Sequence, residues 1–197
     1  MLKRAFDLGV SGALLILLSP VLAALALAVR LESRGPVIFS QPRIGKNDKR
    51  FTMHKFRTMP WNPDAKAASV PHVDDFKTYV FDPLHGDKRY TRIGHLLRST
   101  SLDELPNLWN VLRGDMSIVG PRPEVPGLVD QFPAEYRPRH NVRPGITGLA
   151  QVSGRGLLTY HETILYDLEY VEQHSLVRDL SILARTVPTV LSRRGAR

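Results

Sequence analysis

The chain has 197 residues, of which 27 are Lys or Arg and 19 are Asp or Glu, so its formal net charge is +8 at pH 7. The length predicts one domain, and 43% hydrophobic with 23% charged residues exclude both a disordered tail and a membrane protein of many spans. The absence of cysteine excludes disulfides, zinc ribbons, iron–sulfur clusters and a cysteine nucleophile. The positive charge indicates a polyanionic partner: nucleic acid, anionic lipid or a phosphate-bearing substrate.

An apolar segment opens the chain, because residues 6–29 contain one charged residue, Asp7. As a straight helix this segment would be about 36 Å long, and a hydrocarbon core is about 30 Å thick. The pair Ser19-Pro20 predicts a bend inside it, since proline removes a helical hydrogen bond and disfavours helix at the preceding residue. Basic residues stand on both flanks: Lys3, Arg4, Arg30, Arg34, Arg43 and Lys46.

Three interpretations of this segment stay open. A re-entrant anchor over residues 1–34 is favoured, because basic flanks prefer the cytoplasmic side and only a helix that dips in and returns places both there. A kinked straight span and a cleaved signal peptide are the alternatives, the latter because residues 24–26 (ALA) resemble a cleavage site. The favoured interpretation leaves a domain at residues 35–197.

The remaining segments predict short elements. Residues 37–39 and 51–56 favour strands around a turn at 45–48, which together form a small hairpin. Residues 61–89 show no period and predict a long loop. Helices are predicted over residues 93–98, 125–132, 157–173 and 176–191, and residues 117–119 form a strand or turn. The expected fold class is therefore α/β and mainly helical.

The last helix is amphipathic and basic. It places Leu176, Leu180, Leu183 and Val187 on one side, and Pro188 should kink it or end it early. Such a helix can lie on a membrane surface or pack on the core, and the sequence leaves both open.

The densest group of functional residue types lies around Asp103 and Glu104. A helix is predicted to begin here and to end at Gly114, with Ser101 and Glu104 at capping-box spacing. A cap at Asp103 instead places Pro106 in the first turn, where its missing donor costs nothing. In either register Asp103 lies at a positive helix end, which favours its ionised form.

An ionised and fixed carboxylate can act as a nucleophile toward phosphorus, and a second carboxylate beside it can orient Mg²⁺ or handle a proton. Plain N-capping is the alternative interpretation. Four arginines in or near rigid turns could grip phosphate oxygens bidentately, although each taken singly also suits a solvated surface charge. These are Arg98, Arg122, Arg143 and Arg155.

Five motifs occur in order along the chain: residues 55–59 (KFRTM), 101–106 (SLDELP), 117–124 (SIVGPRPE), 143–148 (RPGITG) and 166–171 (YDLEYV). With them the chain closely resembles the bacterial sugar transferases, also called small monotopic phosphoglycosyl transferases, over nearly its whole length. The resemblance implies a re-entrant helix broken at Ser19-Pro20 and a cytosolic α/β domain at the inner membrane of a bacterium, facing the cytoplasm.

The resemblance also implies an enzyme and its site. The enzyme would move a phosphosugar from a nucleotide-diphospho-sugar, expected to be a UDP-sugar, onto polyprenol phosphate through a covalent aspartyl intermediate, releasing UMP in a first membrane step of glycoconjugate synthesis. An Asp-Glu dyad works with Mg²⁺ in this family, so Asp103 matches the nucleophile and Glu104 its partner. Further positions associated with activity or substrate binding are Lys55, Arg98, Arg122 and Asp167.

Three other functions compete with this interpretation. A basic scaffold or anionic-lipid binder explains the charge and the anchor but not the carboxylate pair. A Mg²⁺-dependent lipid diphosphatase would release inorganic phosphate without a sugar nucleotide. Nucleic-acid binding is disfavoured, because the sequence contains no recognition module.

Overall fold

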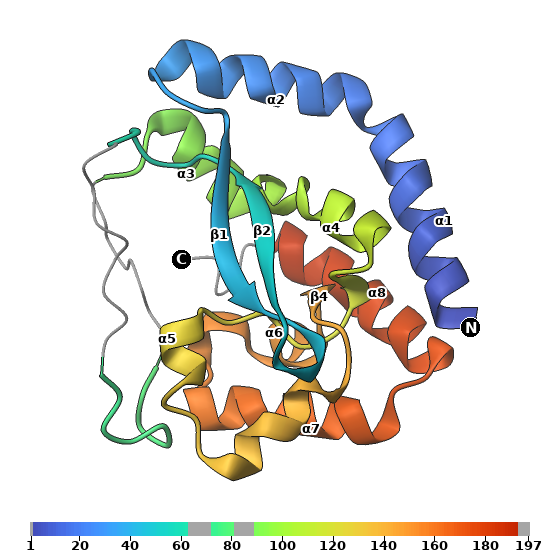
Figure 1. Ribbon diagram of the computed structural model, residues 1–197. Coiled ribbons are helices and arrows are strands. Elements are labelled where there is room, and N and C mark those ends of the chain that lie inside the picture. The colour runs from blue at the N-terminus through green and yellow to red at the C-terminus, as the bar shows by residue number, and fades with distance from the viewer. Residues whose placement is uncertain (1, 63–71, 81–88, 193–197) are drawn as a thin grey trace.

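The computed structural model describes residues 2–62, 72–80 and 89–192 (Figure 1). Within these ranges the chain is mainly helical, as predicted, and it contains two small two-stranded sheets, of which the sequence predicted one. The α-helices are α1 (Leu2–Leu17), α2 (Ser19–Glu32), α3 (Arg92–Thr100), α4 (Asn107–Arg113), α5 (Pro126–Val129), α6 (Leu149–Ser153), α7 (Tyr160–Gln173) and α8 (Leu176–Leu191). The strands are β1 (Ile38–Ile44), β2 (Arg50–Phe56), β3 (Ser117–Val119) and β4 (Gly145–Thr147). Short 3₁₀ segments are η1 (Lys46–Asp48), η2 (Leu102–Glu104), η3 (Ala134–Asn141) and η4 (Arg155–Leu157).

The predicted hairpin is confirmed. Strands β1 and β2 pair antiparallel from Ile38 opposite Phe56 to Ile44 opposite Arg50, so the first strand is longer than the three residues predicted. The second sheet pairs β3 with β4 in parallel. The sequence did not predict β4, because a three-residue strand flanked by glycines carries no alternating apolar pattern.

The predicted bend in the amino-terminal segment is also confirmed. Helices α1 and α2 meet at Leu18 with an angle of 63° between them. Pro20 lies in the first turn of α2, where it has no helical hydrogen bond to remove. Among the described residues, no single helix is both long and apolar enough to cross a membrane, although α1 and α2 together meet the length and composition required.

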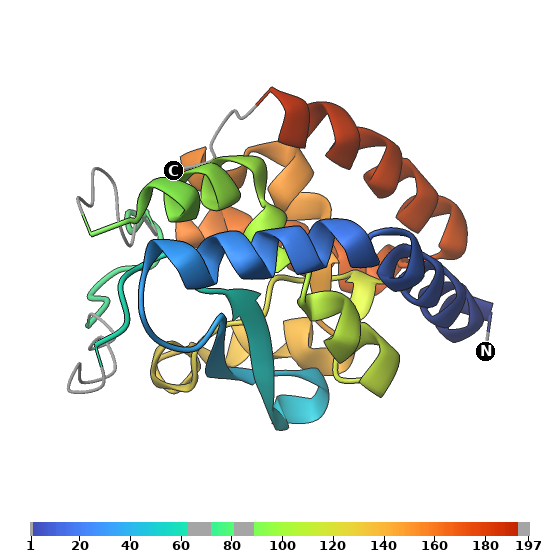
Figure 2. The same cartoon turned by 90° about the horizontal axis from the view of Figure 1, so that it is seen from above.

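These two helices run along the outside of the domain as a bent arm (Figures 1 and 2). Helix α1 packs against α4 and β3, and α2 packs against α3. One core cluster lies beneath α1, and its buried members come from β2, α4, β3, α6, α7 and α8. Strand β3 therefore lies between the arm and the core.

Helix α8 differs in two respects from its prediction. It continues through Pro188 to Leu191 rather than ending early. The predicted apolar side divides, because Leu183 packs against the core while Leu180 and Val187 are exposed. The side that packs inward is centred on Asp179 and Ile182, and an apolar stripe is left outside: Val177, Leu180, Val187 and Leu191.

Two further helices are shorter than predicted. Helix α5 has four residues instead of the eight predicted over 125–132. Helix α7 begins at Tyr160, where Thr159 and Glu162 form a capping box, so the segment 157–159 lies before it.

Candidate functional site

The carboxylate pair lies in a break between two helices. Helix α3 ends at Thr100, Ser101 adopts a left-handed conformation with φ 59°, and η2 then carries Asp103 and Glu104. The predicted helix starting at residue 101 or 103 is therefore wrong: α4 begins at Asn107, after Pro106, and ends as predicted at Gly114 with φ 91°. The Ser101 side chain makes no capping bond, so Asp103 does not lie at an α-helix N-terminus.

Glu104 is held by two cations. Its Oε1 accepts hydrogen bonds from Lys55 Nζ at 2.8 Å and from Arg122 Nη2 at 2.8 Å. Burial alone would raise the pKa of this carboxyl, but the charges and hydrogen bonds of Arg122 and Lys55 outweigh burial and hold the pKa far below its ordinary value. Strand β2 supplies the lysine and the turn after β3 supplies the arginine. Glu104 is therefore a fixed anion that orients its two cations.

Asp103 is only 4% exposed. Among the described residues, no group donates a hydrogen bond to its carboxylate. Burial and the neighbouring charge of Glu104 raise the pKa of Asp103, against the opposing pull of Lys55, Arg98 and Arg122. The expectation that a helix end favours its ionised form is thus replaced by a different balance, in which burial and the charge of Glu104 outweigh the nearby cations and raise the pKa.

A buried ion pair supports Arg122 from behind. Arg139 Nη2 donates to Asp167 Oδ2 at 2.5 Å and to the backbone oxygen of Arg122 at 2.9 Å. Both side chains of the pair are 1% exposed, and Tyr160 OH lies 3.4 Å from Arg139 Nη1. The pair therefore holds the backbone from which the Arg122 side chain reaches Glu104.

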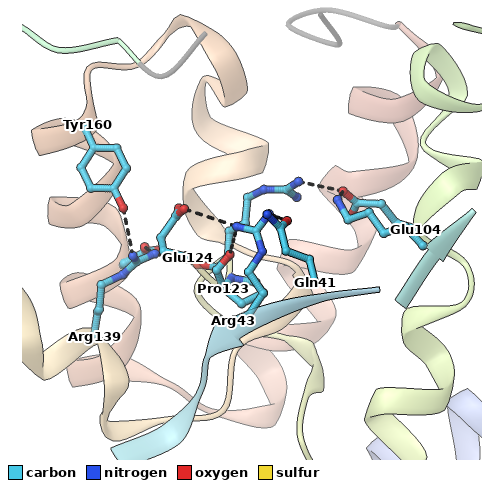
Figure 3. A network of polar contacts seen from close by, with 10 residues as sticks. Gln41, Arg43, Glu104, Pro123, Glu124, Arg139 and Tyr160 are labelled. Carbon is cyan, nitrogen blue, oxygen red and sulfur yellow. Dashed lines mark hydrogen bonds and ion pairs between the residues drawn. The ribbon is translucent and has the colours of Figure 1, made fainter. Parts of the chain in front are cut away.

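A second arginine braces the same turn from the hairpin side (Figure 3). Arg43 Nη1 donates to the Pro123 oxygen at 3.1 Å and lies 3.8 Å from Glu124 Oε2. Its other terminal nitrogen donates to Gln41 Oε1 at 2.9 Å. Figure 3 shows the resulting row of polar contacts, with Arg139 on one side of Arg43 and Glu104 on the other.

The predicted site residues fall into separate groups. Lys55, Arg98 and Arg122 lie close enough to Asp103 to change its pKa, so the structure brings these three and the carboxylate pair together. Two other predicted residues, Arg143 and Asp167, do not join this group among the described contacts. Arg143 Nε donates to Gly114 O at the far end of α4, about 10 Å of helix away. Asp167 is buried against Arg139, and the side chain of Arg155 lies outside the described part of the chain.

Sequence reasoning missed Arg43, Arg139 and Tyr160. Each is far in sequence from the motif it supports, and a single basic or tyrosine side chain carries no local signal of its partner. The rigid Pro-Arg-Pro sequence around Arg122 did indicate a fixed backbone. It did not indicate which groups hold that backbone from outside.

The carboxylate pair also fits one mode of Mg²⁺ binding. The described residues contain no group of three or more His, Asp or Glu side chains that could hold a metal by themselves. Mg²⁺ usually takes one or two carboxylates and completes its shell with water and substrate phosphates. Asp103 and Glu104 match that donor set, and both cations bind Glu104 through Oε1, which leaves Oε2 for another ligand.

Comparison with known proteins shows the family of this chain. A family model described as bacterial sugar transferase matches residues 1–193. A protein of Komagataeibacter xylinus, named undecaprenyl-phosphate glucose phosphotransferase, is 44% identical over 206 residues, which cover 98% of this chain and 36% of that protein. The chain thus spans little more than a third of that relative.

The chain covers a larger share of two other relatives. A UDP-glucose:undecaprenyl-phosphate glucose-1-phosphate transferase of Caulobacter vibrioides is 43% identical, with 96% of this chain and 70% of that protein aligned. An uncharacterized sugar transferase of Bacillus subtilis, EpsL, is 39% identical, with 98% and 89% aligned. On the match of the family model to residues 1–193, the chain belongs to the bacterial sugar transferase family.

Proposed function

We propose that this protein transfers a sugar phosphate from a UDP-sugar to a membrane polyprenol phosphate. The observation that carries the proposal is the buried carboxylate of Asp103, to which no described residue donates a hydrogen bond, beside a Glu104 that Lys55 and Arg122 hold in place. The names of the relatives, which act on UDP-glucose and undecaprenyl phosphate, agree with these two substrate classes. Catalysis here rests on positioning and on charge stabilisation of a diphosphate.

The reaction proceeds in two displacements at one phosphorus. An oxygen of Asp103 attacks the β-phosphorus of the UDP-sugar, the bond from that phosphorus to the bridging oxygen breaks, and UMP leaves with the electron pair. The phosphosugar is then linked to Asp103 as an acyl phosphate. An oxygen of polyprenol phosphate attacks the same phosphorus, the bond to Asp103 breaks, and the carboxylate returns.

The side chains around Asp103 have separate tasks in these steps. Lys55, Arg98 and Arg122 favour the ionised nucleophile, and Arg122, whose guanidinium is partly exposed, also presents donors to phosphate oxygens. Glu104 holds this lysine and this arginine through hydrogen bonds to one of its oxygens. Mg²⁺ held by Asp103 and Glu104 would offset negative charge on the diphosphate.

The proposal includes attachment to the cytoplasmic face of the inner membrane by a re-entrant arm. Both ends of the α1–α2 pair are tied to the same domain: Arg4 donates to Val111 O and Leu112 O at the end of α4, and Arg57 donates to Ser33 O and Arg34 O at the end of α2. A straight span would separate these ends by a bilayer. Large apolar side chains of the arm are exposed: Leu2, Leu8, Ile16, Leu17, Val21, Leu27 and Leu31.

The exposed stripe of α8 gives the domain a second apolar surface. Val177 and Leu191 are 78% and 76% exposed, at opposite ends of the helix. Such a helix suits the boundary between headgroups and acyl chains. Contact there would bring the carboxylate pair near the level at which a polyprenol phosphate presents its phosphate.

A labelling experiment tests the covalent route. The purified protein in lipid nanodiscs is incubated with a UDP-sugar labelled in its β-phosphate, without acceptor. We expect label to stay on the wild-type protein and on Asp130→Asn, a control at an exposed acidic residue, and to leave when polyprenol phosphate is added. Asp103→Asn should retain no label and lose at least 10³-fold in turnover.

Each of three results would overturn a different part of the proposal. Label on Asp103→Asn equal to wild type would overturn the aspartyl intermediate. Absence of UMP release from a panel of UDP-sugars would overturn the donor class. Release of inorganic phosphate from a polyprenol diphosphate, with no sugar nucleotide present, would replace transfer by lipid diphosphatase activity.

A further inference from the structure

The first three turns of α1 carry polar groups, although the helix is otherwise apolar. Lys3, Arg4 and Asp7 form hydrogen bonds with the domain, and Ser11 donates to Asp7 O within the helix. Asp7 and Ser11 are 1% and 0% exposed. A buried carboxylate is costly unless hydrogen bonds compensate its lost hydration. The proposed transfer reaction assigns no task to any of these groups.

Asp7 binds strand β3 directly. Its Oδ1 accepts hydrogen bonds from Ser117 Oγ at 3.0 Å and from the backbone nitrogen of Ile118 at 3.1 Å. Strand β3 pairs with β4, and Ile118 is the middle one of the three residues of β3. Asp7 binds Ile118 from helix α1. The carboxylate of Asp7 thus holds a strand that has one β partner.

Lys3 binds the end of the same strand. Its Nζ donates to Val119 O at 3.1 Å and to the buried Asp179 Oδ2 at 2.6 Å. Tyr170 OH joins the same two residues, at 3.1 Å from Val119 O and 2.7 Å from Asp179 Oδ1. Helix α1 therefore determines the position of β3 at both its middle and its end.

Two residues, Gly120 and Pro121, separate Val119 from Arg122, and hydrogen bonds hold the backbone between them. Gly120 N donates to Thr147 O at 2.9 Å, and Pro121 O accepts from Gly145 N at 2.9 Å. A Cβ on Gly120 would lie 2.4 Å from Arg143 O, so the chain has no room to shift sideways. A displacement of β3 is consequently passed on to Arg122.

We propose that Asp7 is a positioning residue for Arg122, acting through β3. When α1 is packed on the domain, Asp7 and Lys3 hold β3 in the position from which the Arg122 guanidinium reaches Glu104. When α1 is unseated, the guanidinium moves and the carboxylate pair loses one of its two fixed cations. This inference rests on the proposed transferase function, because it assigns Asp7 to the geometry of that site.

A double-mutant cycle between Asp7→Ala and Arg122→Ala tests the proposal in nanodisc-bound full-length protein. With Arg122 present, we expect Asp7→Ala to lower kcat for UMP release at least tenfold. With Arg122→Ala, or Arg122→Lys if the first is too slow, the same change should cost less than threefold. Asp7→Asn keeps an acceptor oxygen for Ile118 N and should stay within threefold of wild type.

A purely structural role gives a different pattern. Equal losses from Asp7→Ala in both backgrounds, or no loss at all, would overturn the positioning role. Val129→Ala is the matched control, because it opens a cavity in a core cluster that does not include β3 and should lower kcat by the same factor with and without Arg122.

Hydrogen–deuterium exchange separates this proposal from the proposed function. Asp7→Ala should accelerate amide exchange across residues 117–124 at least fivefold, and neither Asp7→Asn nor Val129→Ala should do so. If the wild-type protein releases no UMP, the transferase proposal fails and this measurement still decides whether Asp7 holds the turn. Unchanged exchange in Asp7→Ala would overturn the inference.

Discussion

At the scale of single residues, the site depends on two adjacent carboxyl groups whose surroundings push their pKa values in opposite directions. Burial and the Glu104 charge raise the pKa of Asp103, whereas Arg122 and Lys55 overcome burial at Glu104 and lower its pKa. Divergent pKa values in a close pair are typical of groups with different chemical tasks. Glu104 is therefore a permanent anion, and Asp103, the proposed nucleophile, is the carboxyl group of the pair with the raised pKa.

Single residues also show that a buried arginine–carboxylate ion pair and an exposed one contribute differently to stability. Arg139 and Asp167 are each 1% exposed, whereas Arg178 and Glu169 are 21% and 45% exposed. Arg139→Met should lower the free energy of unfolding by about 3–5 kcal/mol, because it leaves a buried charge without a partner. Arg178→Met should cost less than about 1 kcal/mol, since water already screens that pair.

Urea unfolding of both variants measures the difference. Adding Asp167→Leu to Arg139→Met should recover part of the loss, because the lone buried charge is then removed as well. Equal destabilisation by the two arginine changes would contradict a structural role for the buried pair.

At the scale of elements, the hairpin is fastened to η3 through its turn. His140 Nδ1 lies 2.6 Å from Asp48 Oδ1, and the His140 ring stacks on Phe132. Burial and the charge of Arg139 lower the pKa of His140 to about 4, and the opposing effect of Asp48 does not offset them. The folded chain therefore holds His140 neutral, with its Nδ1 proton donated to Asp48.

This depressed pKa predicts a pH dependence of stability. The unfolded chain protonates His140 near pH 6.5 and the folded chain near pH 4, so stability present above pH 6.5 is lost as the pH falls toward 4. The loss from this group should reach about 3 kcal/mol. Thermal unfolding of His140→Gln between these values should show a correspondingly flatter pH dependence than wild type.

A change at an exposed histidine is the matched control. His174 lies beyond the end of α7 and is exposed, so His174→Gln controls for the replacement of a histidine as such. If His140→Gln follows the wild-type profile throughout, the hairpin turn is not fastened by a neutral histidine.

At the scale of the whole molecule, the bent arm predicts which side of a membrane each of its ends faces. The chain contains no cysteine, so single introduced cysteines can be labelled without background. Leu2→Cys and Pro36→Cys should react with a membrane-impermeant maleimide from the cytoplasmic side alone. Leu17→Cys should be protected until detergent is added, because Leu17 is 73% exposed in the protein and only lipid could cover it.

Inverted and right-side-out vesicles provide the comparison. Labelling of residues 2 and 36 from opposite sides would contradict a re-entrant arm and favour a kinked span. Rapid labelling of residue 17 in intact vesicles of both kinds would show that the arm is not inserted.

The sequence by itself determined the features that depend on neighbouring residues. Proline chemistry placed the bend after Leu18, strand and turn residues placed the hairpin, and glycine placed the end of α4 at Gly114. The motifs likewise identified Asp103 and Glu104 as the pair to examine, because a carboxylate pair among arginines has an ordinary chemical meaning. The domain division at residue 34 and the cofactor stay predictions.

Only the tertiary structure decided how those residues are held. The α3–η2–α4 break removed the helix end expected at Asp103, because Ser101 takes a left-handed conformation that no propensity in the segment demands. Arg139 and Asp7 meet Arg122 and β3 from 17 and more than 100 residues away, and a single chain carries no local signal of such pairings. Backbone preferences act between neighbouring residues, so they can be predicted from the sequence. Burial and charge balance instead depend on all the segments that the fold brings together.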